Sequence, residues 1–478
     1  MDNNWETLSG SAAPGEAAAA VGVQPASPEA GASAQDTWPS PRQAWYAVFV
    51  SALVLMVSFI DRSILTLLVE PLKRDLHLTD VQVSLLMGLA FVSSYVAVGL
   101  PVARLADYKS RRAIMGLAVT VWSLMTAVCG LARTFTHLFL CLVGVGAGEG
   151  CSGPANYSMI SDLFPREKLA RAIAVVTIGF YAGSGLALAI GGTLTSIFMA
   201  LPPKTLPLIG FVRGWQLTFF AVGLPGLLVA ALMCTVREPL RRGRLALRGA
   251  GVNGPPKLVP IRDVVAFLRA NASIYIPMFL GTGVQNLVVL GIATWGAVFY
   301  MRTFHWSPAR YGLTLGVIAL TVSPLGSLAG GFLAEYFAKK GYSDANLRVV
   351  RMATMLAVPG LIVYPLMPTA AAAIAIFVYA TFLTSSVNGP LNAALQTITP
   401  NQMRGQVTAI FLIFFNFIGL GLGPTLVALY TQYVFHSERL VGRSMSAAAL
   451  TIGPIAVLLW FIAMKPYARS FERAKAWS

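Results

Sequence analysis

Long apolar runs without any Asp, Glu, Lys or Arg recur along this chain. They cover residues 113–132, 172–203, 214–236, 352–403 and 444–464. A helix that spans a bilayer needs about 20 apolar residues, so each run is long enough for at least one span. The run 352–403 is long enough for two, and Met367-Pro368-Thr369 interrupts it. The pattern therefore predicts a polytopic helical membrane protein.

Counting apolar units of this length gives twelve predicted spans. We place them at 43–68, 81–105, 113–133, 136–163, 168–199, 214–236, 271–300, 309–336, 347–367, 370–397, 404–432 and 442–465. A closed β-barrel is the only other structure that satisfies its backbone hydrogen bonds in lipid. A barrel would show short alternating segments instead of long continuous runs. We therefore expect an all-α membrane protein with twelve transmembrane helices.

The charged residues are few, and the basic ones gather in alternate loops. Only 11% of the chain is charged, against about 25% in soluble proteins. The net charge of +16 raises nucleic-acid binding as an alternative, but the basic residues concentrate at 109–112, 166–171, 237–269, 339–348 and 404. By the positive-inside rule, these loops, the central loop and both termini are cytoplasmic. We expect a multi-pass plasma-membrane protein, in the inner membrane if bacterial, without nucleic acid.

Two short motifs occur once in each half of the chain. Gly153-Pro154-Ala155-Asn156 has a counterpart in Gly389-Pro390-Leu391-Asn392. Leu105-Ala106-Asp107 with Arg111-Arg112 has a counterpart in Leu333-Ala334-Glu335 with Lys339-Lys340. The order and spacing predict two pseudo-symmetric six-helix bundles, with a substrate site between them near the membrane midplane.

This repeat sets the expected organisation of the chain. Residues 1–42, rich in Ala, Gly, Pro and Ser, are expected to form a disordered cytoplasmic tail. Residues 43–236 form the first bundle, 237–269 a cytoplasmic basic linker, 270–466 the second bundle and 467–478 a cytoplasmic tail.

Three charged residues lie inside otherwise apolar segments: Asp61, Arg62 and Glu149. Ionisable groups are costly in hydrocarbon, so each one marks a functional site by default. The alternative is structural, with Asp61-Arg62 as a clamp within the first bundle and Glu149 as its partner. The run Gly144-x-Gly146-x-Gly148 favours close helix packing over nucleotide binding, because it lies in an apolar helix. No spacing of His or Cys suggests a metal site.

Several segments resemble a known family. Residues 99–112 (GLPVARLADYKSRR) resemble the loop signature between helices 2 and 3 of the major facilitator superfamily, although Ala103 replaces its glycine. Within that superfamily, Phe59-Ile60-Asp61-Arg62, residues 144–149 and residues 161–165 resemble the Spinster-like transporters. The resemblance implies transport of lipid-like or organic anionic solutes, with Asp61 and Glu149 as proton-coupling acids. Related transporters usually carry an arginine where this chain has Leu142, which leaves Arg62 as the main expected cation of the first bundle.

Physical chemistry supports coupling at these acids. A conformational change that alters the distance of Arg62, or the access of water, would shift the proton affinity of Asp61. Proton binding would then be linked to the side of the membrane that is open.

A second set of charges lies at the ends of the predicted helices. Asp107, Arg111 and Arg112 are interpreted as a gate, with Asp162 and Arg171 as partners. The second copy supplies Glu335, Lys339 and Lys340. The alternative is a static charge cluster that only fixes topology.

The second bundle offers amides instead of charges. Its candidate cavity residues are Gln285, Asn286, Asn388 and Asn416. We expect an asymmetric cavity, charged on one wall and apolar with amides on the other, which suits an amphipathic substrate. The amides equally suit interhelical hydrogen bonds.

The sequence therefore predicts a monomeric secondary active transporter for an amphipathic, anionic, lipid-like solute, coupled to protons and working by alternating access. The alternatives are a proton-coupled transporter of small organic acids or drugs, and a non-transporting sensor or scaffold. No cofactor and no enzymatic activity are expected.

Overall fold

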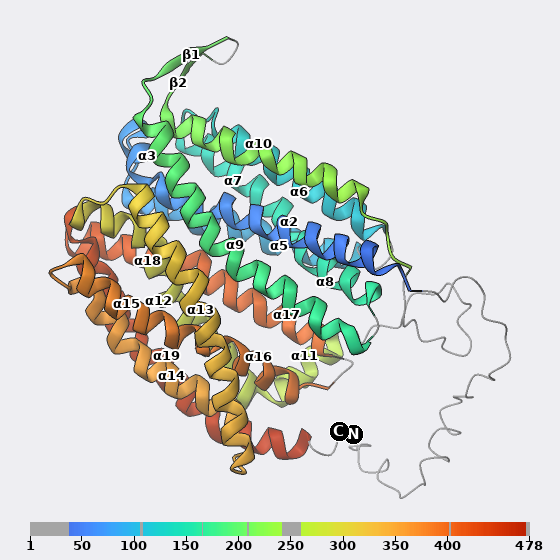
Figure 1. Cartoon of the computed structure of the whole chain (residues 1–478). Coiled ribbons are helices and arrows are strands. Elements are labelled where there is room, and N and C mark those ends of the chain that lie inside the picture. Colours follow the sequence, from blue (N-terminus) through green and yellow to red (C-terminus); the bar gives the residue numbers. More distant parts are fainter. Residues whose placement is uncertain are drawn as a thin grey trace, which may run out of the picture.

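A computed structural model describes residues 38–105, 109–164, 166–207, 210–240, 260–400 and 403–474 (Figure 1). Nearly all of the predicted tail at 1–42, most of the predicted linker at 237–269, and residues 475–478 lie outside these ranges. Asp107 also lies outside them.

The first half of the chain forms a bundle of helices and one short hairpin. Its elements are α2 (Pro41–Leu67), α3 (Val69–Leu76), α4 (Asp80–Leu85), the π-helix η2 (Leu86–Ala90), α5 (Phe91–Leu105), α6 (Arg111–Cys129), α7 (Phe135–Gly150), α8 (Ser152–Leu163), α9 (Arg166–Ala200), β1 (Lys204–Leu206), β2 (Gly210–Val212) and α10 (Gly214–Thr235). The two strands pair antiparallel, with Lys204 opposite Val212, and the hairpin projects beyond the helices (Figure 1).

The second half repeats the helical pattern. Its elements are α11 (Ile261–Ala270), α12 (Ala272–Phe304), α13 (Pro308–Lys339), α14 (Ala345–Val363), the 3-10 helix η3 (Tyr364–Leu366), α15 (Ala370–Ser386), α16 (Asn388–Thr397), α17 (Arg404–Phe414), the π-helix η4 (Phe415–Leu422), α18 (Gly423–Leu429), the π-helix η5 (Tyr430–Val434), the 3-10 helix η6 (Glu438–Leu440) and α19 (Val441–Ala474). Helix α11 lies within the segment expected to be linker, and α19 continues beyond residue 466.

All twelve predicted spans are helical, which confirms the all-α membrane fold. Among the described residues, eleven helical segments are long and apolar enough to cross a membrane. The fourth predicted span breaks at Cys151 into α7, with 16 residues, and α8, and the tenth breaks at Val387 into α15 and α16. The Ser152 hydroxyl donates a hydrogen bond to the Glu149 carbonyl at 2.9 Å at the Cys151 break. A conformational irregularity therefore directly follows the buried acid.

The two halves meet where their backbones approach closely. Helix α9 packs along α13, and η2 packs against η4. A Cβ built on Gly316 would lie 2.6 Å from the carbonyl oxygen of Gly185, so only glycine fits at this crossing of α13 and α9. A Cβ on Gly88 would likewise lie 2.5 Å from the carbonyl oxygen of Gly421. Two glycine contacts thus join the halves.

The hydrophobic core divides unevenly between the two ends of the molecule. We call the end that carries α3, the β1–β2 hairpin and η6 the hairpin end, and the end that carries Arg111, α8 and α11 the linker end. One core cluster combines both halves, with Leu72 and Trp215 from the first and Tyr300 and Tyr364 from the second. Two further clusters each draw their buried members from one half only, at 44–236 and 264–467. The two halves therefore share one hydrophobic core towards the hairpin end.

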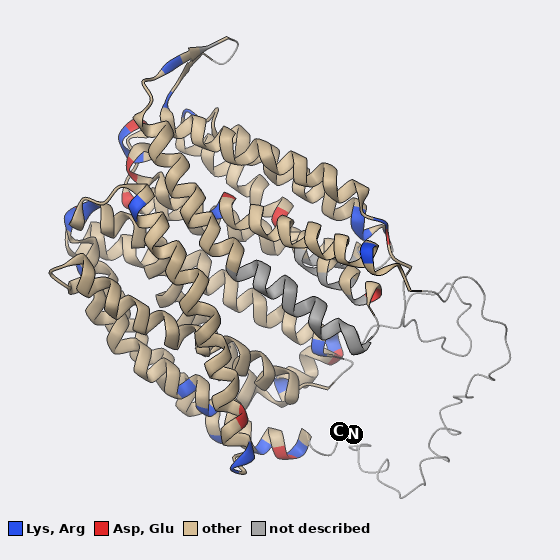
Figure 2. Cartoon of the chain, viewed as in Figure 1, with Lys and Arg blue, Asp and Glu red and all other residues tan. Residues whose placement is uncertain are grey.

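The charges follow the same division into ends and body. Most Lys, Arg, Asp and Glu lie near the ends of the helices, and long stretches between them carry none (Figure 2). This distribution suits a protein that spans a bilayer, because water can solvate charged side chains only at the two ends of the molecule.

Candidate functional site

The three intramembrane charges lie on two neighbouring segments of the first half. Asp61 and Arg62 are in the last two turns of α2, and Glu149 is in the last turn of α7. Helix α2 has 27 residues, its third charged residue, Arg42, lies at its start, and Ser40 caps that start by accepting a hydrogen bond from Gln43 N. Asp61 is 6% exposed and Glu149 is 1% exposed. Neither acid faces lipid.

Glu149 and Arg62 form a buried, charge-assisted pair. The Oε2 atom of Glu149 accepts hydrogen bonds from Arg62 Nε at 2.7 Å and from the Ser58 hydroxyl at 2.6 Å. The Nη2 atom of Arg62 lies 2.5 Å from the same oxygen. Ser58 and Arg62 are four residues apart on α2, so both point towards α7. Ser58 was not among the site residues predicted from the sequence. Its spacing of four residues from Arg62 on the predicted helix could have indicated that the two share one face.

Two aromatic rings hold the guanidinium from its other side. Arg62 Cζ lies 4.4 Å from the centroid of Phe91 and 5.5 Å from that of Tyr95, both on α5. Cation–π contacts of this kind favour a cation in a poorly solvated place. Gly146 makes the arrangement possible, because any Cβ there would collide with the backbone oxygen of Phe91. The glycine run of α7 therefore serves close packing, and 31% of the Arg62 side chain remains exposed.

Asp61 is in a different environment. Neither of its carboxyl oxygens makes a hydrogen bond, and the Oε1 atom of Glu149 also makes none. The indole of Trp122 lies beside Asp61 without a well-formed hydrogen bond. A buried carboxylate without donors is costly, so Asp61 is the less compensated of the two acids. Two acids thus lie near each other, one bonded to a cation and one not.

This site adjoins the contact between the halves. Leu420 of η4, in the second half, packs against the core cluster that contains Phe91. Gly421 of η4 approaches Leu89 and Val92. Leu142 is buried among apolar residues, and it brings no charge to this site.

Gln285 lies inside the second half, where it joins three helices. Its Oε1 atom accepts hydrogen bonds from Thr354 of α14 at 2.9 Å and from the Trp460 indole of α19 at 2.8 Å. The side chain is 7% exposed. These contacts fit the alternative of an interhelical hydrogen bond.

We expect Gln285→Leu to lower the free energy of unfolding by about 1–3 kcal/mol, because the Trp460 N–H would then be buried without an acceptor. Thermal unfolding in detergent measures this effect. Asn388→Leu, at an exposed position, is the control. A Gln285→Leu protein that unfolds like the wild type but fails to transport would instead return Gln285 to the substrate path.

The three asparagines are less constrained by other helices. The Nδ2 atoms of Asn286 and Asn416 donate to carbonyls four residues earlier, Thr282 O and Leu412 O, both at 2.9 Å. Asn388 is exposed at the start of α16, and its carbonyl accepts from Asn392. Asn286 and Asn416 lie at the α12–η4 contact, where Gly419 packs on Asn286.

The first-half gating candidates gather around one buried arginine. Arg111 is 1% exposed. Its Nη1 atom lies 2.5 Å from Asp162 Oδ2, and its Nε atom lies 3.1 Å from Glu238 Oε1. Glu238 also accepts from the backbone N–H of Arg112 at 2.8 Å. The sequence analysis did not assign Glu238 to this cluster, because its position after α10 looked like part of the linker.

The bonds to Glu238 change its acidity. Burial acts to raise the pKa of this carboxyl, but the hydrogen bonds from the Arg112 backbone, the Ser110 hydroxyl and Arg111 together hold it below its usual range. Glu238 therefore stays ionised and ties the end of α10 to the start of α6.

The remaining gating candidates lie elsewhere. Arg171 is on α9, but the description does not extend to its side chain. Glu335 and Lys339 form an exposed pair at 2.7 Å, one turn apart on α13. Lys340 lies 4.5 Å from the ring centroid of Tyr336. The described ion pairs at the linker end each join residues of one half.

The fold and the buried charges define a class, a polytopic helical transporter with two matching halves. The Major Facilitator Superfamily matches residues 51–424, and the chain belongs to this family. It is therefore a secondary transporter and not an enzyme.

Three relatives extend the comparison. An MFS-type efflux pump of Mycolicibacterium smegmatis is 25% identical over 439 residues, which cover 90% of this chain and 94% of the pump. The protein spinster of Drosophila melanogaster is 23% identical over 66% of this chain, a match that spans 50% of that protein. The structure resembles the crystal structure of a bacterial homologue of the human lysosomal transporter Spinster in an inward-facing, unoccupied conformation. Its TM-score is 0.72 at 25% identity, covering 91% of this chain and 99% of that one. The predicted Spinster resemblance is thereby confirmed.

Proposed function

We propose that this transporter carries an amphipathic, anionic, lipid-like solute and couples its movement to protons bound at Asp61 and Glu149. The observation that carries the proposal is the buried Glu149–Arg62 pair next to Asp61, which has no donor. Uncompensated acids deep in a membrane protein mark proton and ion paths.

The substrate class follows from the surroundings of Arg62. The Arg62 side chain is 31% exposed, its guanidinium is stacked on Phe91 and Tyr95, and Leu420 of η4 packs against the core cluster that contains Phe91. A solute anion that approached Arg62 would compete with Glu149 for it, and the released Glu149 carboxylate would then need a proton. This exchange would couple the solute to the proton. The apolar rings and Leu420 suit a hydrocarbon tail.

The orientation is part of the same proposal. We propose that the linker end and both termini face the cytoplasm, which the basic loops at that end support. The hairpin end then faces outwards, in the plasma membrane or a bacterial inner membrane. Among the described residues, the buried core cluster that joins the two halves lies towards the hairpin end, so we infer an inward-facing conformation. We also propose that the transporter works as a monomer.

A transporter of small organic acids or drugs is the second candidate. The name of the mycobacterial relative, an efflux pump, favours it. The same site chemistry would serve, because a carboxylate solute also pairs with Arg62.

Proteoliposomes that contain a pH-sensitive dye test the proposal. Adding a lysophospholipid or a fatty acid should change the luminal pH, and a protonophore should abolish solute accumulation against its gradient. Protein-free liposomes are the control for passive flipping of fatty acids. A pH change with gluconate-type organic acids but with none of the lipids would overturn the lipid assignment. No pH change with any solute would overturn proton coupling.

A further inference from the structure

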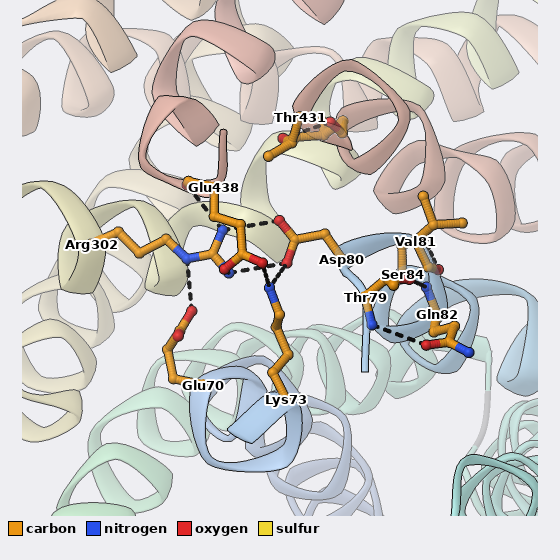
Figure 3. Close-up of polar contacts among 11 residues, drawn as sticks. Glu70, Lys73, Thr79, Asp80, Val81, Gln82, Ser84, Arg302, Thr431 and Glu438 are labelled. Carbon is orange, nitrogen blue, oxygen red and sulfur yellow. Dashed lines mark hydrogen bonds and ion pairs between the residues drawn. The ribbon is translucent and has the colours of Figure 1, made fainter. Parts of the chain in front are cut away.

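Five charged side chains meet at the boundary between the halves at the hairpin end (Figure 3). The first half contributes Glu70 and Lys73 from α3 and Asp80 from α4, and the second half contributes Arg302 from α12 and Glu438 from η6. We call these five residues the hairpin-end cluster. None of the gating residues expected from the sequence belongs to it.

Arg302 makes the largest set of contacts across the boundary. Its Nη1 and Nη2 atoms each lie 3.0 Å from a different oxygen of Asp80, a two-pronged guanidinium–carboxylate pair. Its Nε atom lies 2.7 Å from Glu70 Oε1. Only 8% of the side chain is exposed, so water screens these pairs weakly.

Lys73 makes a second connection between the halves, in which the first half supplies the cation and the second half supplies the acid. Its Nζ atom lies 2.6 Å from Glu438 Oε1 of the second half and 2.5 Å from Asp80 Oδ1 of its own half. Asp80 therefore accepts donors from both halves, and its side chain is 2% exposed. Each half thus sends one cation to an acid of the other half.

The ends of the helices help to position these side chains. His77 ends α3 in a left-handed conformation with φ 52°. Thr79 and Gln82 then form a capping box that starts α4 at Asp80. His305, with φ 54°, ends α12 just after Arg302. Two sharp helix ends therefore aim Asp80 and Arg302 at each other.

Beneath the cluster, the halves remain in contact. The hydroxyl of Ser84 on α4 donates to Thr425 on α18 at 3.3 Å, and Ser84 is fully buried. Beside the cluster, a cavity of about 340 Å³ is lined by Thr79, Asp80, Gln432 and Glu438, among others. Solvent can therefore reach one side of the acids but not Ser84.

We propose that the hairpin-end cluster is a latch that holds the hairpin end closed and sets how often the transporter opens there. The inference deepens the proposed function, because it concerns the alternating access of that same transporter. Opening this end separates Arg302 from Asp80 and Lys73 from Glu438. Loss of Arg302 alone also leaves three acids against one cation, and Glu438 would then repel Glu70 and Asp80 across the boundary.

Ser84 provides a direct measure of opening that does not depend on transport. The substitution Ser84→Cys, in a protein whose four native cysteines are changed to serine, reports access from the hairpin end through the reaction rate of the new thiol with a charged maleimide. Arg302→Gln should raise this rate by about tenfold or more, since one partner of a buried pair is removed. Arg302→Glu should raise it further, and Arg302→Lys should raise it less than Arg302→Gln.

Two controls separate opening from general loosening. Arg310→Gln removes another arginine of the hairpin end, one stacked on Trp306 at 4.4 Å, and should leave the rate within about twofold, as expected of an exposed charge. A second reporter, Ser51→Cys, lies at a position fully buried within the first half and should stay unreactive in every variant.

The labelling is done on purified protein in detergent, so the latch and the proposed function fail separately. An unchanged labelling rate of the Ser84→Cys reporter in both Arg302→Gln and Arg302→Glu would overturn the latch, whatever the liposomes show. Equal increases at the Ser84→Cys and Ser51→Cys reporters would also overturn it, because the substitution would then loosen the whole fold. Faster labelling at position 84 alone supports the latch even if no lipid is transported.

Discussion

Asp61→Asn is expected to abolish proton-driven accumulation of the solute while leaving the protein about as stable as the wild type, or more stable. The Asp61 carboxyl is 6% exposed and has no donor on either oxygen. An amide has nearly the same shape and carries no charge that burial would penalise, so we expect the free energy of unfolding to change by less than about 1 kcal/mol or to rise.

The measurement combines solute accumulation at several imposed pH gradients with thermal unfolding of the same preparation. In the variant, accumulation should no longer respond to the gradient, while downhill exchange of solute persists. Asp263→Asn is the matched control, because Asp263 is half exposed and pairs only loosely with Arg262 at 3.4 Å. Accumulation that still follows the pH gradient in Asp61→Asn would assign this acid a structural role.

Removing the charge of Glu149 should damage both transport and stability, because Arg62 depends on it. Glu149 Oε2 accepts three donors, two from Arg62 and one from Ser58. Truncation to alanine leaves the guanidinium partly buried with only Phe91 and Tyr95 to stabilise it. Breaking a buried pair on one side costs about 3–5 kcal/mol, so Glu149→Ala should unfold at a markedly lower temperature. Glu149→Gln keeps acceptors for the donors and should lose less stability, while transport still fails.

A double variant separates the two effects of Glu149. Arg62→Met combined with Glu149→Gln removes the charged partner as well, so most of the lost stability should return while transport stays absent. Glu335→Gln is the control, since Glu335 is exposed and its ion pair among the described residues is with Lys339 on its own helix. If the double variant is less stable than Glu149→Ala, the pair is not the source of the stability loss. Normal coupled transport in Glu149→Gln would remove this acid from the proton path.

The helices were accessible to sequence reasoning because their cause is local. A run of about 20 apolar residues must satisfy its backbone internally in lipid, whatever its neighbours are. The break between α7 and α8 was not predicted, although Gly153-Pro154 lies just after it, because its position depends on packing. The π-helices η2 and η4 were not predicted either, since they occur where Gly88 and Gly421 meet across the halves.

The candidate site also has a part that the sequence predicts and a part that only the structure shows. Asp61, Arg62 and Glu149 stand out in the sequence because charge is rare in a span. That Glu149 pairs with Arg62, and that Asp61 has no donor, depends on how α2 and α7 are rotated. Gln285 illustrates the limit of composition, because the same amide suits a cavity or an interhelical bond, and only the positions of Thr354 and Trp460 show which contacts it makes.

Sequence alone determined the class of this protein, its two-half organisation and the three charges placed at a cost within the membrane. It did so because burial in hydrocarbon restricts what each segment can be, one segment at a time. Only the tertiary structure decided which charges are partners. Arg111, at the start of α6, pairs with Glu238, which follows α10. Arg302, in the second half, pairs with Asp80, in the first half. Such pairs form between residues far apart in the chain, and their strength comes from shared exclusion of water, which no single segment reveals.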